Sequence, residues 1–365
     1  MAAKVNENGV HGLEPATKKC RAELTELQKF DEVFQQLVDD ITKQGLKDGE
    51  IHDAFKWFKE VCEYNVPFGK KNRGMAVVSS YRYLVTEDKL TEDNLNKARI
   101  LGWCVEWLQA FFLVADDIMD HSFTRRGKPC WYKKEGVGLI AINDSFFLEM
   151  CIYQILKKYF REETYYIDIV ELFHETTLQT EIGQNLDLIT AQDHVDFNSF
   201  SQERYNAIVK WKTAFYSFYL PVACAMYMAG ISDSESHANA KTILLEMGHF
   251  FQVQDDYLDC YGDPAVIGKV GTDIQDNKCG WLIIQALKRA SPEQIKILEE
   301  NYACHDDLKV AKVKEIFNQL KLSELYTQYE EESYQDLMQL IEKYSQNLPK
   351  QMFIAFAKKI YKRNR

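Results

Sequence analysis

One ten-residue pattern occurs twice in this chain and restricts the folds that the chain can adopt. The pattern is Phe-Phe-x-Val-x-Asp-Asp-x-x-Asp, and its copies span residues 111–120 and 250–259. On an α-helix, residues four apart share a face and lie about 6 Å apart along the axis. Each copy therefore gathers three carboxylates at the end of an apolar run. Two such helices are expected to face each other across one bundle.

The two aspartate trios predict a cation-dependent site. They are Asp116, Asp117 and Asp120 in the first copy, and Asp255, Asp256 and Asp259 in the second. Like charges at this spacing repel, and the apolar approach makes the repulsion stronger. Hard carboxylate oxygens suit Mg²⁺, which is commonly shared with substrate phosphates. Two solvated acidic turns are the alternative, but they have no need for the same apolar approach twice. We therefore expect all six carboxylates to serve a paired metal–phosphate site.

The remaining pattern predicts an all-α protein. The 365 residues contain only 7 Pro and 17 Gly, and apolar residues recur at helical spacing with no sustained alternation. The longest expected helices cover about 50–64, 74–86, 92–120, 138–161, 163–190, 199–229 and 235–260. Residues 1–20 resemble a flexible tail, and residues 21–365 are expected to form a single large helical bundle around a central cavity.

Charge and cysteine content exclude several functions. A net charge of −11 disfavours a nucleic-acid partner or an anionic membrane surface. The longest uncharged stretch, within residues 213–234, contains Pro221 and is a poor candidate for a membrane span, and the first 20 residues lack a signal-peptide core. Nine cysteines without a Cys-x-x-Cys pair indicate reduced thiols in a cytoplasmic setting.

A di-iron carboxylate bundle is the rival interpretation of these helices. Such bundles use Glu-x-x-His pairs, and Glu171 with His174 and Glu246 with His249 fit that spacing. However, His249 lies six residues before Asp255 and points to another face of the same helix. We interpret both histidines as core or interface residues, and a count of bound iron would separate the two interpretations.

Basic residues lie where an anion would need them. Arg125 and Arg126 follow the first trio, at an expected helix end closed by Gly127, and Lys70 and Arg73 lie at an expected helix start. Lys212 lies on an aromatic helix, and Lys278 follows the second trio. Gly268–Gly271 is not a nucleotide-binding loop, because Val270 follows the lysine, but Lys269 remains a candidate diphosphate contact.

These motifs together resemble those of the short-chain trans-prenyltransferases. The resemblance rests on residues 69–74, 116–126, 212–213 and 252–259, and it continues through 271–278 and the ending 359–363. It covers nearly everything after residue 20. It implies an all-α homodimer whose two Asp-rich helices lie on opposite walls of a deep cavity.

The resemblance also implies roles for individual residues. Three Mg²⁺ ions would bridge the two trios to an allylic diphosphate, with Asp116, Asp120 and Asp255 as the expected direct ligands. The expected catalytic groups are these three aspartates with Arg125, Lys212 and Lys269. Contacts to the allylic diphosphate are expected from Arg125, Lys212, Thr213, Gln252, Lys269 and Lys278. Contacts to isopentenyl diphosphate are expected from Lys70, Arg73, Gln109, Arg126 and Arg363.

The implied reaction is head-to-tail condensation of isopentenyl diphosphate with dimethylallyl and then geranyl diphosphate. Phe112 lies one helical turn before Asp116, with Phe111 beside it, so a tail anchored at the metals would run past both rings. In the family these two positions limit chain length, and farnesyl diphosphate is the expected product. Synthesis of geranyl or geranylgeranyl diphosphate is the alternative, with a terpene cyclase a more distant one because the second trio is complete.

Overall fold

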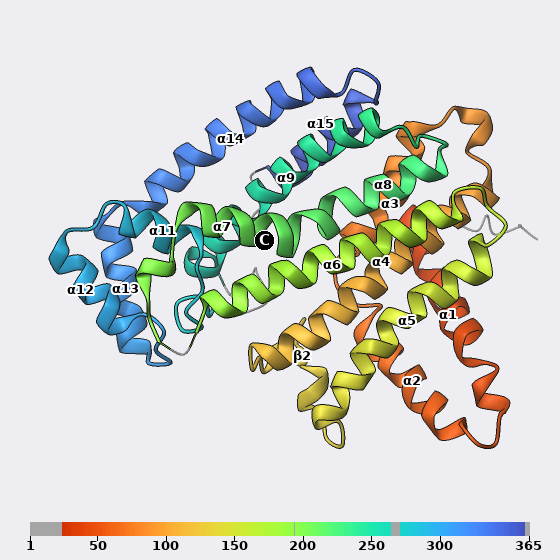
Figure 1. Cartoon of the computed structure of the whole chain (residues 1–365), viewed down its shortest axis with the longest axis horizontal. Helices are drawn as coiled ribbons and strands as arrows, with labels where there is room; N and C mark the ends of the chain where they lie inside the picture. The colour runs from red at the N-terminus through yellow and green to blue at the C-terminus, as the bar shows by residue number, and fades with distance from the viewer. Residues whose placement is uncertain (1–23, 193, 264–270, 362–365) are drawn as a thin grey trace, which may run out of the picture.

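The computed structural model describes residues 24–361, apart from 193 and 264–270, and it is built almost entirely of helices (Figure 1). In the amino-terminal half the α-helices are α1 (Glu26–Thr42), α2 (His52–Asn65), α3 (Asn72–Leu84), α4 (Glu92–Met119), α5 (Ala141–Phe160) and α6 (Tyr166–Thr190). In the carboxyl-terminal half they are α7 (Gln202–Ile208), α8 (Leu220–Met228), α9 (Ser234–Tyr261), α11 (Trp281–Leu287), α12 (Pro292–Asn301), α13 (Asp307–Gln319), α14 (Leu322–Tyr344) and α15 (Lys350–Ile360). The all-α prediction is confirmed.

Short segments complete the chain between these helices. The 3₁₀ turns are η1 (Gly45–Lys47), η2 (Glu87–Lys89), η3 (Trp131–Lys133), η4 (Gly138–Ile140) and η5 (Phe197–Ser199). A π-helical segment, η6 (Val209–Tyr219), joins α7 to α8. The strands of the described residues are β1 (Thr124–Arg125) and β2 (Lys128–Pro129), which pair antiparallel.

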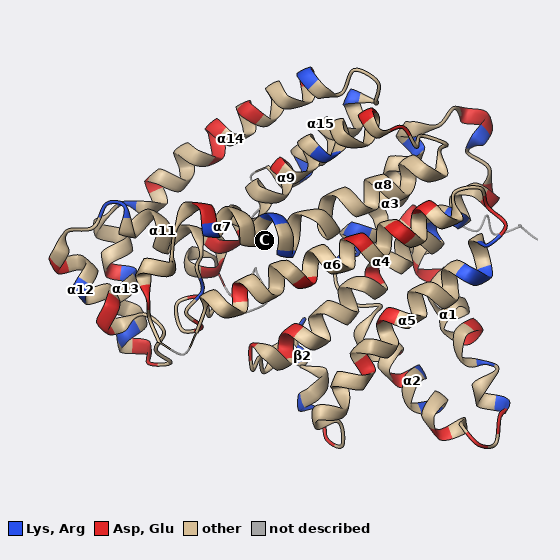
Figure 2. Ribbon diagram, viewed as in Figure 1, with Lys and Arg blue, Asp and Glu red and all other residues tan. Residues whose placement is uncertain are grey.

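Local sequence explains where several helices begin. Thr25 and Gln28 form a capping box at the start of α1, and Ser291 and Gln294 form another before Pro292. Thr91 caps α4, whose apolar face is wide enough to make it the central helix of the bundle. Helix α8 is apolar on all sides: it carries no Lys, Arg, Asp or Glu (Figure 2) and is almost wholly buried.

Two apolar clusters hold the helices together. The larger is formed by α1, α2, α3, α4, α5, α6, α8 and α15, with one side of α9 and the end of α14. The smaller is formed by α7, α11, α12, α13 and the start of α14. Helix α9 contributes Phe250 to the first cluster and Val253 to the second, so the second aspartate trio begins where the clusters meet.

Two predicted elements differ from the structure. Residues 199–229 were expected to form one α-helix, but the middle third is the π segment η6. The expected helix end at Gly127 is wrong, because α4 ends at Met119 and residues 124–129 form a β-hairpin. Arg126 and Gly127 have φ values of 54° and 75°, which a two-residue hairpin turn requires. The division into a tail of 1–20 and one domain of 21–365 stays a prediction.

Candidate active site

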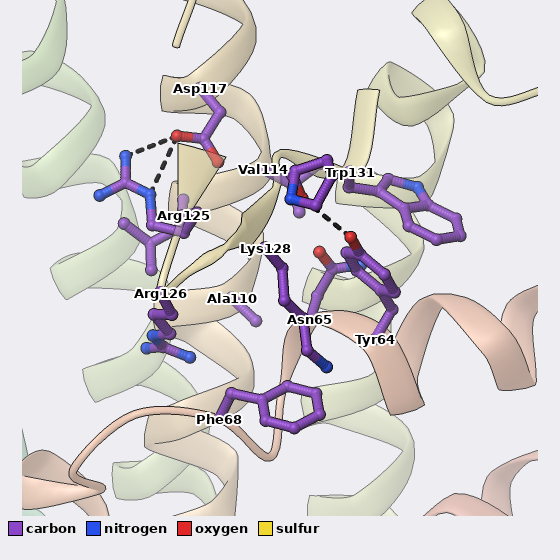
Figure 3. Close-up of a pocket in the computed structure, with 12 residues that line it drawn as sticks. Tyr64, Asn65, Phe68, Ala110, Val114, Asp117, Arg125, Arg126, Lys128 and Trp131 are labelled. Atoms are coloured by element: carbon purple, nitrogen blue, oxygen red, sulfur yellow. Dashed lines mark hydrogen bonds and ion pairs between the residues drawn. The ribbon is translucent and has the colours of Figure 1, made fainter. Parts of the chain in front are cut away.

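The first aspartate trio lies at the carboxyl end of α4, beside the β-hairpin. Arg125 of β1 donates from Nε and Nη2 to Oδ1 of Asp117, at 3.0 and 2.5 Å (Figure 3). Its Nη2 also reaches Oδ2 of Asp116 at 3.3 Å. The hairpin therefore turns Arg125 back onto the helix that precedes it, which a continuing α-helix could not do.

Two lysines from distant segments reach the other carboxylates of this trio. Lys212 of η6 lies 3.5 Å from Oδ1 of Asp116, and Lys278, from the segment before α11, lies 3.1 Å from Oδ2 of Asp120. Both ammonium groups also meet Oδ2 of Asp187 on α6, at 2.6 and 3.0 Å. The expected repulsion within the trio is thus balanced by cations from three other segments.

Burial and neighbouring charges shift the pKa values of these carboxyl groups in different directions. Burial raises the pKa values of Asp117 and Asp120, and the neighbouring Asp116 raises that of Asp120 further. Burial also acts on Asp116, but Lys212 and Arg125 outweigh it and lower that pKa. For Asp187 the two lysines outweigh burial and lower the pKa to about 2. Asp187 is therefore a fixed anion between two cations.

The π segment places Lys212 by close packing between two helices. A methyl group added at Gly183 of α6 would lie 2.0 Å from the backbone nitrogen of Lys212, and one at Gly248 of α9 would lie 2.5 Å from Cβ of Ala214. Glycine at both positions lets η6 pass between α6 and α9. Because π-helical hydrogen bonds link residues five apart, Lys212 and Ser217 lie on one face of this segment.

The second trio has a different environment. Asp256 is buried, and its Oδ1 accepts from Nε2 of Gln252 at 2.9 Å while its Oδ2 accepts from the backbone N–H of Trp281 at 2.8 Å. Oδ2 of Asp259 accepts from the backbone N–H of Asp273 at 3.0 Å. Asp255 is half-buried on the same helix.

A second group of charged and polar residues, the second cationic group, lies about two helical turns before the first trio on α4, beside the start of α3. Arg73 donates to Oγ of Ser217 at 2.8 and 3.0 Å and stacks on Tyr216, with Cζ 4.8 Å from the ring centre. Gln109 joins this group by accepting from Nη1 of Arg73 at 2.8 Å and donating to Glu106 at 3.2 Å. Glu106 is buried and accepts from the backbone N–H at the start of α3, and burial raises its pKa.

Arg126 links this second group to the hairpin. Gly69, with φ of +99°, precedes Lys70, and a methyl group there would lie 2.8 Å from Cζ of Arg126. Arg126 and Arg125 also line a small cleft between the α2–α3 loop, α4 and the hairpin (Figure 3). Lys128 and Phe68 also line it, with the Lys128 ammonium group 3.4 Å from the centre of the Phe68 ring. The cleft therefore borders both the cations around the first trio, through Arg125, and the second cationic group, through Arg126.

The two phenylalanines of the first copy lie between the cationic groups. Phe111 is buried and Phe112 half-buried, with ring centres 4.8 Å apart. Phe112 meets Tyr216 edge-on at 5.4 Å. The structure thus places both rings along α4 between Asp116 and Gln109, as the helical spacing predicts.

The remaining predicted residues divide into three groups. Lys70 is exposed in the loop before α3, and Thr213 is half-buried on η6. Lys269 and Arg363 lie outside the described residues. His249 contacts Tyr329 and Asn206, at 3.2 and 3.1 Å, and His174 packs on Tyr153. Neither histidine meets an aspartate trio, so the di-iron interpretation has no support here.

Sequence reasoning missed Asp187 and Gln184. Gln184 donates to Oδ1 of Asp116 at 3.0 Å, one helical turn before Asp187. Both lie at the end of the predicted helix 163–190, and only 5 % of Asp187 is exposed. An acid among apolar residues near a helix end was the available signal, but only the fold shows which lysines it meets.

The fold is that of the isoprenoid synthases. Solved structures of Trypanosoma brucei farnesyl diphosphate synthase, complexed with risedronate or with the bisphosphonate BPH-722, superpose with a TM-score of 0.84 at 31 % identity, covering 93 % of this chain and 100 % of theirs. A family model described as polyprenyl synthetase matches residues 55–320. The chain belongs to the polyprenyl synthetase family.

Several curated relatives match almost the full chain. Farnesyl pyrophosphate synthase of Gallus gallus is 55 % identical over 100 % of this chain and 98 % of its own length. The Bos taurus protein of the same name is 57 % identical over 95 % and 99 %, and the Saccharomyces cerevisiae protein 52 % over 93 % and 97 %. The family predicted from the motifs is confirmed.

Proposed function

We propose that this chain is a trans-prenyltransferase that condenses isopentenyl diphosphate with dimethylallyl and then geranyl diphosphate to give farnesyl diphosphate. The names of its near full-length relatives support this reaction. The observation that carries it is the network joining Asp116 and Asp120 to Lys212 and Lys278. Such cations and carboxylates are what a diphosphate and its metal ions would use.

The carboxylates fit Mg²⁺ by their chemistry. Asp116, Asp120 and Asp255 offer the hard oxygen donors that Mg²⁺ prefers. Among the described residues no three acidic, Cys or His side chains converge as a ready cluster, and the first trio instead faces Lys and Arg. We propose that three Mg²⁺ ions per site neutralise the charge that grows on the departing diphosphate.

The cations of the first network would bind the allylic diphosphate. Arg125, Lys212 and Lys278 hold positive charge where the allylic C–O bond breaks, and charge stabilisation there is greatest in the transition state. Thr213 and Gln252 would add polar contacts, with Lys269 a further candidate from outside the described residues. The released diphosphate is the proposed proton acceptor.

The second cationic group would bind isopentenyl diphosphate. Arg73 is held by Tyr216, Ser217 and Gln109, and Arg126 reaches the same region from the hairpin. Lys70 would complete this pocket, together with Arg363 from outside the described residues. The two substrates would then lie on either side of Phe112.

Product analysis tests the proposal. The purified chain, with Mg²⁺, isopentenyl diphosphate and dimethylallyl diphosphate, should release farnesyl diphosphate with geranyl diphosphate as an intermediate. The Phe111→Ala/Phe112→Ala variant should extend the product to twenty carbons or more, because both rings block the path along α4. A cyclised product or a main product of ten or twenty carbons from the natural chain would contradict the assignment, and a fifteen-carbon limit in the variant would place the stop elsewhere.

We also propose that the chain forms a homodimer through α5 and α6. The exposed apolar residues follow one face of each helix and are Ile142, Phe146 and Met150 on α5 with Ile167, Leu178, Ile182 and Ile189 on α6. Apolar patches of this kind usually mark an interface. By length and composition α4 and the stretch Gly138–Phe160 could each cross a membrane, and the latter includes this same face of α5. Covering these faces in a dimer accounts for them, so we propose no stable membrane insertion and a cytoplasmic location.

Light scattering tests the dimer. A Phe146→Glu/Ile182→Glu variant should run as a monomer, since charges placed in a buried apolar interface are costly. Leu308→Glu, on the exposed side of α13, is the matched control and should stay dimeric. A natural chain that runs as a monomer, or a variant that stays dimeric, would contradict this interface.

A further inference from the structure

Two members of the second trio hold the backbone of the segment that carries Lys278. The N–H of Asp273 donates to Oδ2 of Asp259 at 3.0 Å, and the N–H of Trp281 donates to Oδ2 of Asp256 at 2.8 Å. Residues 273–281 are therefore attached to α9 at both ends. In this segment side-chain carboxylates accept the hydrogen bonds of backbone N–H groups that backbone carbonyl oxygens would accept in a regular helix or strand.

Asp256 is engaged on both oxygens. Its Oδ1 accepts from Nε2 of Gln252 at 2.9 Å, and only 7 % of the residue is exposed. A methyl group at Gly280 would lie 3.4 Å from Oδ2 of Asp256, so the backbone passes directly over the carboxylate. A metal ion at Asp256 would have to replace these bonds.

The segment 273–281 places Lys278 against the carboxylates of the first trio and of α6. Lys278 meets Asp120 at the end of α4 and Asp187 on α6, and its own carbonyl oxygen accepts from the hydroxyl of Tyr302 at 2.7 Å. Asn277, with φ of 54°, donates to the carbonyl oxygen of Gln192 at 2.8 Å. The hydrogen bond to Asp256 holds the N–H of Trp281, three residues after Lys278. Loss of this bond would loosen the backbone that positions the Lys278 ammonium group.

We propose that Asp256 is a positioning residue: it fixes the segment 273–281, with Asp259 as the second anchor, so that Lys278 reaches the first trio. Ion binding by the second trio then falls chiefly to Asp255. This division rests on the proposed function for the role of Asp255, which the family resemblance already implies as the direct ligand of this trio, and it gives Asp256 and Asp259 a separate task. The two trios share a sequence but divide their tasks.

Hydrogen–deuterium exchange on the metal-free full chain tests the anchor without any catalytic readout. Asp256→Ala should speed exchange in peptides covering 271–281 by about tenfold, because a buried charge-assisted hydrogen bond is lost. Asp256→Asn should stay within about threefold of the natural chain, since an amide can accept from Trp281 and donate to Gln252 after that side chain rotates. Asp255→Asn is the matched control and should leave these peptides unchanged. Unchanged exchange in Asp256→Ala would overturn the anchor.

Activity then separates positioning from ion binding. Asp256→Asn should keep the Mg²⁺ concentration for half-maximal rate within about twofold, whereas Asp255→Asn should raise it by about tenfold or more. Asp256→Ala should raise the KM for the allylic substrate because Lys278 is displaced. If Asp256→Asn shifts the Mg²⁺ requirement as Asp255→Asn does, Asp256 binds ions and the division is wrong. A chain that shows no prenyl transfer would refute the proposed function alone, since the exchange experiment would still test the anchor.

Discussion

The two aspartate trios have nearly the same local sequence and opposite surroundings. The first faces side-chain cations, with Arg125 on Asp117, Lys212 near Asp116 and Lys278 on Asp120. The second faces backbone, with N–H groups of residues 273 and 281 on Asp259 and Asp256. A repeated motif on repeated helices therefore does not produce two copies of one site.

The difference comes from what the fold packs against each helix end. Helix α4 ends beside the hairpin, η6 and the segment before α11, which bring Arg125, Lys212 and Lys278. Helix α9 is followed by a chain segment that returns across its own end, where Gly271 would collide with the Asp259 carbonyl oxygen, at 1.9 Å, if it had a side chain. One trio is thereby prepared for an anionic ligand, and the other holds the segment that helps to prepare it.

The largest expected effect falls on the first aspartate of each trio. Asp116→Ala and Asp255→Ala should each lower kcat by about a thousandfold or more, since loss of metal-assisted charge stabilisation is worth several kcal/mol. Circular dichroism should show an unchanged helix content in both variants, and addition of EDTA should stop the natural chain. Near-normal turnover in either variant would contradict the proposal that both trios hold catalytic metal ions.

A smaller effect should distinguish the two cationic groups. Arg125→Gln should lower kcat with the allylic substrate by about ten- to a hundredfold, because Arg125 lies where charge develops. Arg73→Gln should mainly raise the KM for isopentenyl diphosphate, since Arg73 lies beyond Phe112 with Ser217 and Tyr216. Steady-state kinetics with each substrate varied in turn would measure this. Equal damage to both substrates' parameters by both variants would remove the distinction between the pockets.

The smallest effect concerns the anion that holds both lysines. The pKa of Asp187 is lowered to about 2 from an unfolded value of about 3.9, so its stabilising contribution is complete above pH about 4 and is lost as the pH falls toward 2. The unfolding free energies of the natural chain and of Asp187→Asn should therefore differ most near neutral pH. This difference should shrink by on the order of 2 kcal/mol below pH 4. Urea unfolding in EDTA would measure it, and a difference independent of pH would mean that Asp187 is not an ion-paired carboxylate.

Sequence patterns predicted the helices and the family but not the network. Long apolar periodicity located α4, α6 and α9 within a few residues, because burial of one face dictates that spacing. The hairpin that carries Arg125 was missed, since Arg126 has a positive φ that residues of its type seldom adopt. The partners of Asp187 and the anchoring role of Asp256 depend on contacts between segments far apart in sequence, which no local pattern specifies.

The central claim is that both trios act on one diphosphate across a single site. Calorimetric titration with inorganic pyrophosphate, with and without Mg²⁺, tests it directly on the natural chain, Asp116→Ala and Asp255→Ala. We expect tight, Mg²⁺-dependent binding by the natural chain and a loss of at least about tenfold in affinity in each variant, because each removes a ligand to ions that bridge the same anion. Binding that survives in either variant with unchanged affinity would contradict the shared site.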